Sequence, residues 1–245
     1  MERKMTAETL KKAQNEIDEM IEKCARDASL TTPDIAPIYD GIADEEGYLN
    51  SKVRVAWVLK EPYDDKDDNG NPCGGEWSLP KDCFTLDKLS KVETVIDNPV
   101  WDKIARVMFG FRHKKKCGTM PDIKSVPTML QEIRSIAWVN ISKMPNHTSS
   151  SDYWVRLAYQ RYWKDVVNFQ LKTYAPDVII FGYTYPCFDC YASAVKRDDL
   201  SNEWVTCYYL GKQYLLDTYH PGRKGDDYVD AIIDALTLIE KDMRA

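Results

Sequence analysis

Long apolar segments are missing from this sequence. No uninterrupted apolar stretch approaches the roughly 18 residues that suggest a membrane-spanning helix, so we expect a soluble protein with no membrane partner. The polar N-terminus, Met1 to Lys4, lacks the apolar segment of a secretory signal peptide. Without such a signal, the odd number of cysteines, 7, does not indicate a disulfide framework. We therefore expect a reducing, cytoplasmic environment.

Positive charge is also scarce. Lys and Arg number 33 against 39 Asp and Glu, which gives a net charge of −6. Nucleic-acid-binding proteins usually carry a basic surface, so this balance counts against tight duplex binding unless cations gather on one face. No internal repeat or low-complexity tract is present, and 245 residues fit one large α/β domain. We expect 1–245 to form a single domain and a monomer, with residues 1–50 as an N-terminal helix and irregular extension.

Strand-like and helix-like patterns alternate along the chain. Apolar runs predict strands over 53–59, 136–141 and 177–182, and a hairpin of 204–210 with 213–218. Apolar spacing and capping residues predict helices over 6–26, 99–109, 152–173, 185–195 and 226–242, with Gly110 ending the second. Crossover helices between parallel strands cover both faces of a sheet. The order therefore predicts a three-layer α/β/α sandwich with a central, mostly parallel four-stranded sheet.

Polar residues follow two of these strands. Glu61 lies in Lys60-Glu61-Pro62-Tyr63, directly after the first strand, and His220 precedes Pro221-Gly222 after the last. Loops that leave the carboxyl ends of parallel strands are where α/β proteins place their chemistry. The sequence thus predicts a carboxylate and an imidazole at one site.

Further motifs lie between these two in a recognisable order. Gly75-Glu76-Trp77-Ser78-Leu79 follows the first, Trp138-Val139-Asn140-Ile141 ends the second strand, and Ala175 to Gly182 contains the third. Together with the motifs at Glu61 and His220, this series resembles the uracil-DNA glycosylase superfamily over roughly residues 53 to 240. Each motif is short, so the resemblance rests on their combination and order.

The resemblance implies a role for each of these residues. Glu61 would position or activate water, and Tyr63 would wall the pocket. Trp77 would stack on an extruded base, and Asn140 would recognise its edge. His220 would donate a hydrogen bond toward the base oxygen that gains negative charge as the glycosidic bond breaks. The implied reaction is hydrolysis of the N-glycosidic bond of uracil or another damaged base in DNA.

Basic residues near the motifs are the expected DNA contacts. We predict that Lys60, Lys143, Arg223 and Lys224 bind phosphates of single-stranded DNA or a damaged duplex. The chain departs from the family after Pro221, where it lacks the apolar wedge that other members insert between bases. It also carries Glu61 where the strongest uracil-specific members carry Asp. The cysteine spacing does not match that of relatives with an iron–sulfur cluster, so we expect neither a metal nor a cofactor.

Other interpretations of the same residues stay open. Asn140 is equally suited to capping the turn after its strand, and Trp77 to closing a lid. Cys187 and Cys190 suit an ordinary core role or a redox or metal pair. The basic run 112–116 suits a solvated loop or a phosphate contact. The whole pocket also suits a protein that binds a nucleobase-like ligand, nucleotide or nucleic acid without catalysis. A further alternative is an interaction protein that uses the fold alone and in which the pocket has no role.

Overall fold

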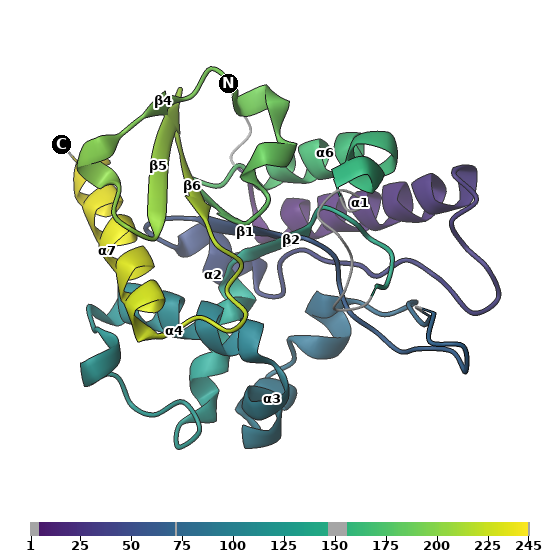
Figure 1. The fold of residues 1–245 in the computed structure, drawn as a ribbon, viewed down its shortest axis with the longest axis horizontal. Helices are drawn as coiled ribbons and strands as arrows, with labels where there is room; N and C mark the ends of the chain where they lie inside the picture. The colour runs from purple at the N-terminus through teal and green to yellow at the C-terminus, as the bar shows by residue number, and fades with distance from the viewer. Residues whose placement is uncertain (1–4, 72, 147–155, 245) are drawn as a thin grey trace.

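The computed structural model describes residues 5–71, 73–146 and 156–244. Within them the chain forms a six-stranded sheet in the order β2-β1-β3-β6-β5-β4 (Figure 1). The strands are β1 (Val55–Leu59), β2 (Ala137–Asn140), β3 (Val178–Gly182), β4 (Val195–Lys196), β5 (Val205–Leu210) and β6 (Gln213–Thr218). Neighbours among β2, β1, β3 and β6 are parallel, whereas β5 and β4 are antiparallel.

The α/β class is confirmed, but the prediction of a four-stranded sheet is wrong. The predicted hairpin forms as β5 and β6. β6 pairs in parallel with β3 and so extends the sheet to β5, and β4 adds an edge strand next to β5. Both residues of β4 are exposed. A two-residue strand with no buried face leaves no alternating apolar pattern, which explains why the sequence did not reveal it.

The helices connect and cover these strands. The α-helices are α1 (Ala7–Asp27), α2 (Glu45–Asn50), α3 (Val92–Asp97), α4 (Pro99–His113), α6 (Lys164–Tyr174) and α7 (Asp226–Asp242). Short 3-10 segments span Lys88–Ser90, Cys117–Thr119, Pro127–Ser135, Tyr185–Cys187, Asp189–Tyr191 and Asp198–Leu200, and π-helical turns span Leu79–Cys83 and Tyr159–Trp163. In the described ranges, no helix has the length and apolar content to cross a bilayer.

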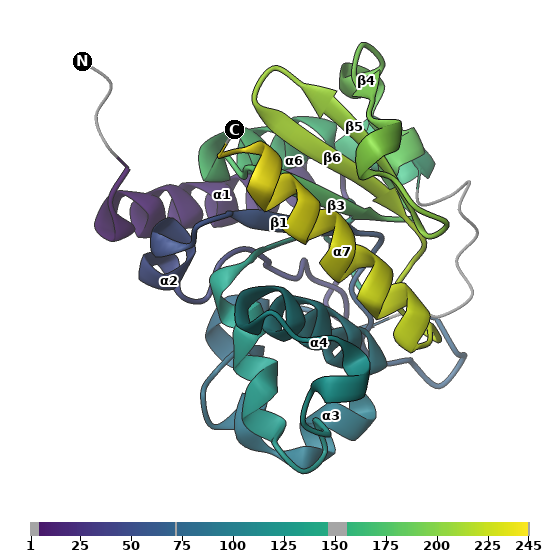
Figure 2. The same cartoon turned by 90° about the vertical axis from the view of Figure 1, so that its left-hand side faces the viewer.

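Each face of the sheet has its own hydrophobic core. In β1, Val55, Trp57 and Leu59 pack in the core that contains residues of α4 and α7, while Ala56 and Val58 pack in the core that contains residues of α1 and α6. Every residue of β1 is buried, as a central strand covered on both sides requires. Figures 1 and 2 show α1 and α6 on one face and α4 and α7 on the other. The order of layers is helix, sheet, helix.

Most of the predicted helix limits agree with the structure. α7 has the predicted bounds, and α1 begins one residue later than predicted, after a capping box formed by Thr6 and Thr9. The prediction that Gly110 ends α4 is wrong, because the helix continues to His113. A Cβ at Gly110 would lie 2.4 Å from both Ile233 Cδ1 and Met120 Cε, so glycine serves close packing against α7 here.

The predicted helix over 185–195 is wrong, and the one over 152–173 falls partly outside the described residues. The first of these segments forms two 3-10 turns before β4. Its rings pack around Phe181, with centroids of Tyr185, Phe188 and Tyr191 at 5.3, 5.0 and 5.7 Å. This aromatic packing, rather than helical periodicity, determines the path of the chain. For the second segment, the described part is helical from 156 to Tyr174.

Parallel pairing brings the carboxyl ends of β2, β1, β3 and β6 to one edge of the sheet. Gly182, at the end of β3, allows the flanking segments to approach each other. A Cβ there would lie 2.7 Å from Leu59 Cδ2 and 3.2 Å from Pro221 Cδ. The segments that follow β1 and β6 therefore meet across the end of β3.

Candidate functional site

A cavity of about 640 Å³ opens at this edge of the sheet. Its wall includes six of the residues that the sequence analysis singled out: Glu61, Tyr63, Trp77, Asn140, His220 and Arg223. Apolar and aromatic side chains, among them Leu79, Trp101 and Trp138, complete the wall. A largely apolar cavity of this size with a few polar groups is typical of a small-molecule site.

His220 presents a neutral imidazole to the cavity. The backbone N–H of Gly222 donates a hydrogen bond to Nδ1 of His220, at 3.2 Å. Burial, with the nearby charges of Lys60 and Lys224, lowers the pKa of His220 from 6.5 to about 4. Because Nδ1 accepts a hydrogen bond, the proton of the neutral ring is on Nε2. The ring is thus set up as a hydrogen-bond donor at neutral pH without carrying charge.

Glu61 and Tyr63 come from the segment after β1. The Glu61 side chain is buried, with 8% of its surface exposed, and it lines the cavity together with Tyr63. Burial and the nearby Glu61 raise the pKa of Tyr63, whose ring is 48% exposed. The segment is held to the chain beyond β2 by the N–H of Asn146, which donates to the carbonyl of Pro62 at 3.0 Å. Glu61 is therefore an inner wall residue and Tyr63 a residue of the mouth.

Asn140 ends β2 with its carboxamide at the cavity. Its side chain is buried, and within the described part of the chain the carboxamide makes no hydrogen bond. Its backbone N–H donates to Oδ2 of Asp40 at 2.6 Å. The side chain does not cap a turn in the described structure, so the capping interpretation has no support. A carboxamide offers two N–H donors and one acceptor oxygen, so it can form hydrogen bonds to the polar edge of a ring.

Trp77 is held in place by a carboxylate. Its Nε1 donates to Oδ2 of Asp64 at 2.6 Å, and the N–H of Gly75 donates to the same oxygen at 2.8 Å. The carbonyl of Trp77 accepts the N–H of Tyr39 at 3.0 Å. The indole is partly buried against the core and lines the cavity. Such fixed placement suits a stacking surface better than a freely moving lid.

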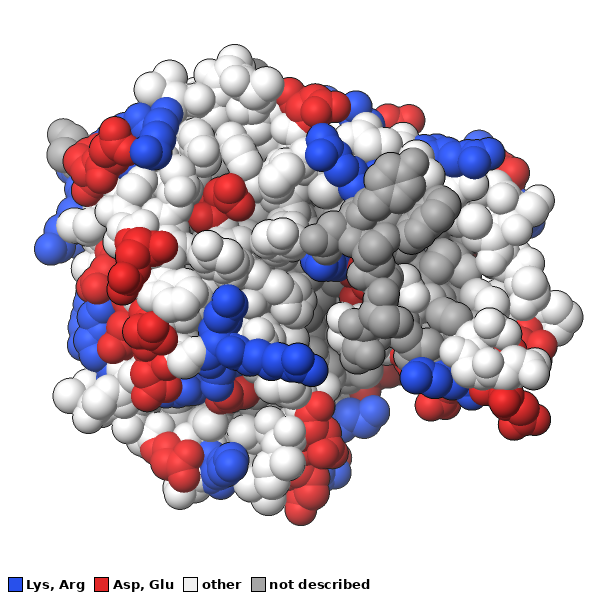
Figure 3. Space-filling model, in the orientation of Figure 1, with Lys and Arg blue, Asp and Glu red and all other residues white. Residues whose placement is uncertain are grey.

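Lys60, Lys224 and Arg223 lie around the mouth of the cavity. Lys60 Nζ lies 5.1 Å from the ring centroid of Tyr183, and Lys224 Nζ lies 4.4 Å from that of Tyr219. Arg223 is exposed and lines the cavity, with a backbone φ of 63°. Figure 3 shows basic side chains gathered over the segment that joins β6 to α7. These three residues place positive charge beside the cavity, close to His220 in the case of Lys60 and Lys224.

The structure contradicts the prediction that Lys143 binds phosphate. Lys143 is fully buried, and its Nζ lies 2.8 Å from each carboxylate oxygen of Asp40. It also donates to Oε1 of Gln170 at 2.7 Å. Burial lowers the pKa of Lys143, and Asp40 opposes that change. Lys143 therefore has a structural role inside the protein and does not face the cavity mouth.

Sequence reasoning missed several residues that form or support this site, of which Trp138 and Asp64 are examples. Trp138 lines the cavity, and its buried Nε1 has no hydrogen-bond partner among the described residues. It precedes Asn140 by two positions in β2, so strand alternation places both on one face and was a usable signal. Asp64, which holds Trp77, lies in a run of aspartates that gave no sign of which one is structural.

Metal and disulfide chemistry find no support in the described residues. No group of three or more His, Cys, Asp or Glu side chains there is arranged to hold a metal ion. No disulfide joins any of the cysteines. Cys187 is buried and Cys190 is exposed, so only the first has the predicted core position.

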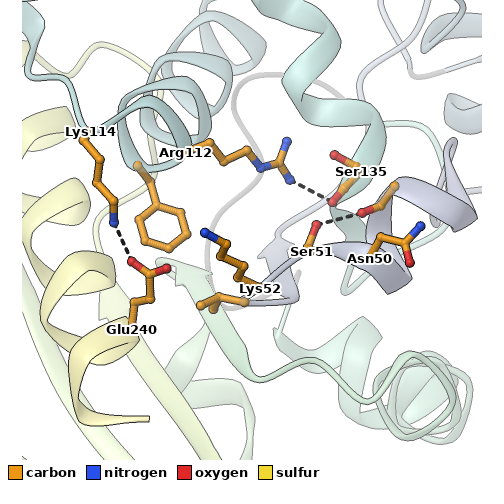
Figure 4. Close-up of a pocket in the computed structure, with 10 residues that line it drawn as sticks. Asn50, Ser51, Lys52, Arg112, Lys114, Ser135 and Glu240 are labelled. Carbon is orange, nitrogen blue, oxygen red and sulfur yellow. Dashed lines mark hydrogen bonds and ion pairs between the residues drawn. The ribbon is translucent and has the colours of Figure 1, made fainter. Parts of the chain in front are cut away.

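A second, smaller cavity of about 380 Å³ lies near the amino ends of β1 and β2 (Figure 4). It contains part of the basic run 112–116. Lys114 pairs with Glu240 at 2.5 Å, and Arg112 donates to the carbonyl of Ser135 at 3.1 Å. These two cations are thus already engaged by the protein. None of the predicted site residues lines this cavity, whereas six of them line the larger one.

The sequence matches no protein-family model, and no curated protein matches it. The functional assignment therefore depends on the geometry and chemistry of the larger cavity.

Proposed function

We propose that this protein is a DNA glycosylase-like enzyme that hydrolyses the N-glycosidic bond of uracil or another damaged base. One observation carries the proposal: a buried carboxylate, Glu61, and a neutral imidazole, His220, line the same cavity. They are 159 positions apart in the sequence and meet at one sheet edge. Trp77 and Asn140 add a ring surface and an edge-reading carboxamide.

The expected chemistry assigns a step to each residue. The base stacks on Trp77 and bonds through its edge to Asn140. As the bond between the base and C1′ breaks, the electron pair leaves with the base, and His220 Nε2–H donates to the base oxygen that becomes negative. Glu61 offsets the positive charge on the sugar, orients water toward C1′ and accepts its proton. The products are an abasic sugar and the free base, which takes up a proton.

The energetic logic favours a neutral histidine. A donor that strengthens only as charge develops on the base stabilises the transition state more than the bound substrate. A neutral ring makes no strong ion pair with substrate phosphates beforehand. Loss of one such donor typically lowers the rate by about 10²–10³-fold.

A second candidate function is binding of a nucleobase-like ligand or nucleotide without hydrolysis. The observation that favours it is the burial of Lys143, which removes part of the predicted phosphate-binding surface. Asp97 also adds an acidic residue to the cavity wall. A neutral ligand without a long phosphate backbone would suit this charge distribution.

Cleavage assays separate the two functions. Single- and double-stranded oligonucleotides that carry uracil, hypoxanthine, xanthine or hydroxymethyluracil are incubated with the protein, and abasic sites are revealed by alkali. We expect product with the native protein and at least about 100-fold less with His220→Ala or Glu61→Gln. His113→Ala and Glu203→Gln, at exposed positions outside the cavity, are the matched controls. Absence of product on every substrate, with calorimetric binding of a free base, would favour the second function.

A further inference from the structure

Two half-exposed tyrosines stand beside the cavity on adjacent strands. Tyr183 follows β3 and Tyr219 follows β6, and the residues before them, Gly182 and Thr218, are paired in the sheet. The N–H of Tyr183 donates to the carbonyl of Thr218 at 2.8 Å. The two side chains are 50% and 49% exposed. Large residues this exposed, at neighbouring positions after two paired strands, mark a surface that contacts something.

The backbone conformation of Tyr183 is consistent with a binding role for this arrangement. Tyr183 has a φ of 66°, in the left-handed region that a bulky residue rarely adopts. Two hydrogen bonds hold its N–H, to the carbonyls of Phe181 and Thr218 at 3.0 and 2.8 Å. Strain of this kind persists where the surrounding structure fixes it, and it is found often at binding sites.

Each of these rings has a cation over it. Lys60 lies over Tyr183, and Lys224 lies over Tyr219, with Nζ-to-centroid distances of 5.1 and 4.4 Å. The charges of both lysines lower the pKa of His220, so both lie near its imidazole. Two rings with a cation at either side therefore follow the ends of β1, β3 and β6, next to the cavity. We call Lys60, Tyr183, Tyr219 and Lys224 the aromatic-cationic row.

Such a row has the chemistry of a single-strand binding surface. Any unpaired base can stack on an aromatic ring, because every base has a flat face, while cations next to the rings contact the phosphates between the bases. In a duplex the bases are already stacked and paired, and a base must be extruded before it reaches a pocket. The segment from Pro221 to Gly225 offers no apolar side chain for that purpose, because Pro221 is buried and Arg223 is charged.

We propose that the aromatic-cationic row binds the unpaired nucleotides that flank the base in the cavity, so that single-stranded DNA is the substrate class. The inference rests on the proposed function for the choice of nucleic acid as ligand. Its physical basis is independent of catalysis, because base stacking and phosphate contacts need neither the Glu61 carboxylate nor the His220 imidazole. Double-stranded DNA and acidic proteins are the competing partners that the test separates.

The test measures binding rather than turnover. Fluorescence anisotropy of a labelled thymidine oligonucleotide, which contains no damaged base, is recorded for the native protein, Tyr183→Ala and Tyr219→Ala. We expect each Ala variant to bind about tenfold more weakly. Tyr183→Phe and Tyr219→Phe should bind as the native protein does, because stacking needs the ring and not the hydroxyl. Lys224→Gln should weaken binding and reduce its dependence on salt. Phe169→Ala and Lys212→Gln, at exposed positions on α6 and in the β5–β6 turn, are the matched controls.

The outcomes are distinguishable from those of the cleavage assay. Tighter binding to the single strand than to its duplex, lost in both Ala variants while thermal unfolding is unchanged, would support the row even if no base is released. Equal binding of native and Ala proteins would overturn it, as would a preference for the duplex or binding only to an acidic peptide. Base release with an unaltered rate in both Ala variants would retain the proposed function and reject the row.

Discussion

Lys143 Nζ lies 2.8 Å from each carboxylate oxygen of Asp40, and both side chains are fully buried. Gln170 donates to Asp40 Oδ1 at 2.8 Å, and the N–H of Asn140 donates to Oδ2 at 2.6 Å. The ion pair thus fixes the end of β2, from which Asn140 reaches the cavity. A buried charge pair of this kind matters for geometry because each partner satisfies the other away from water.

The first prediction concerns this pair. Lys143→Met leaves the Asp40 carboxylate buried without its cation, and we expect a loss of about 3–5 kcal/mol in the free energy of unfolding. Urea denaturation measures it. The double variant Asp40→Asn with Lys143→Met should recover part of the loss, since no charge remains. Lys81→Met, which breaks an exposed pair with Asp18, should cost less than about 1 kcal/mol. Similar losses for Lys143→Met and Lys81→Met would contradict the interpretation.

A second prediction follows from the neutral state of His220. Its pKa is lowered to about 4, whereas an unfolded chain gives histidine a pKa near 6.5. Between these values the unfolded state binds a proton that the folded state does not, so stability falls as the pH drops through this window. At about pH 4 the loss due to His220 reaches up to roughly 3 kcal/mol.

Urea unfolding at neutral pH and near the lower end of that window tests this prediction. His220→Gln should lose less stability on acidification than the native protein, and the exposed-site control His113→Gln should behave like the native protein. An equal loss of stability on acidification in native and His220→Gln proteins would show that a group other than His220 causes the pH dependence. The proposed glycosylase activity should persist below pH 6.5, because His220 stays neutral with its proton on Nε2.

The third prediction concerns the hydrogen bond that orients Trp77. Asp64→Ala removes the acceptor of the Trp77 indole and of the Gly75 N–H. We expect the ring to become more mobile and more accessible, at a cost of about 1–3 kcal/mol for the unpaired donors. The emission of Trp77, obtained by difference from Trp77→Phe proteins, should shift to longer wavelength and be quenched more readily by acrylamide. Asp65→Ala, at the exposed neighbouring position, should leave both signals unchanged.

The fourth prediction tests the backbone of the same segment. Gly75 has a φ of 101°, and a Cβ there would lie 2.0 Å from the carbonyl oxygen of Ala36. Gly75→Ala should therefore destabilise the protein by about 2 kcal/mol or more. Gly70 has a φ of 81° but nothing within 4 Å of its Cβ position, so Gly70→Ala should cost only about 1 kcal/mol. If urea midpoints of the two variants coincide, the contact with Ala36 does not matter.

The sequence was informative where local patterns decide the structure. The central strands are apolar on both faces, and α7 has a continuous apolar side with clear limits, so both were predictable within a few residues. The residues Glu61, Asn140 and His220 were predictable as neighbours because each lies at or just after the carboxyl end of a parallel strand. Strand order itself then follows from pairing that no local pattern encodes.

Long-range contacts account for the rest. Lys143 has the appearance of a surface residue in a polar segment, and only Asp40, 103 positions earlier in the chain, makes it internal. Gly110 has the appearance of a helix end, and its close contacts with Ile233 of α7 and with Met120 explain its size. The turns at 185–191 follow ring packing around Phe181, which helix propensity does not describe.

β6 pairs in parallel with β3 and antiparallel with β5, and its two ends lie in different parts of the molecule. His220 leaves one end of β6, whereas Gly211 and Lys212 form the tight turn at the other. Six residues of extended chain separate them by roughly 20 Å. Gly211 has a φ of 64° and open space around its Cβ position. A dye, a surface tether or a fused domain attached at this turn would leave the cavity open to its ligand.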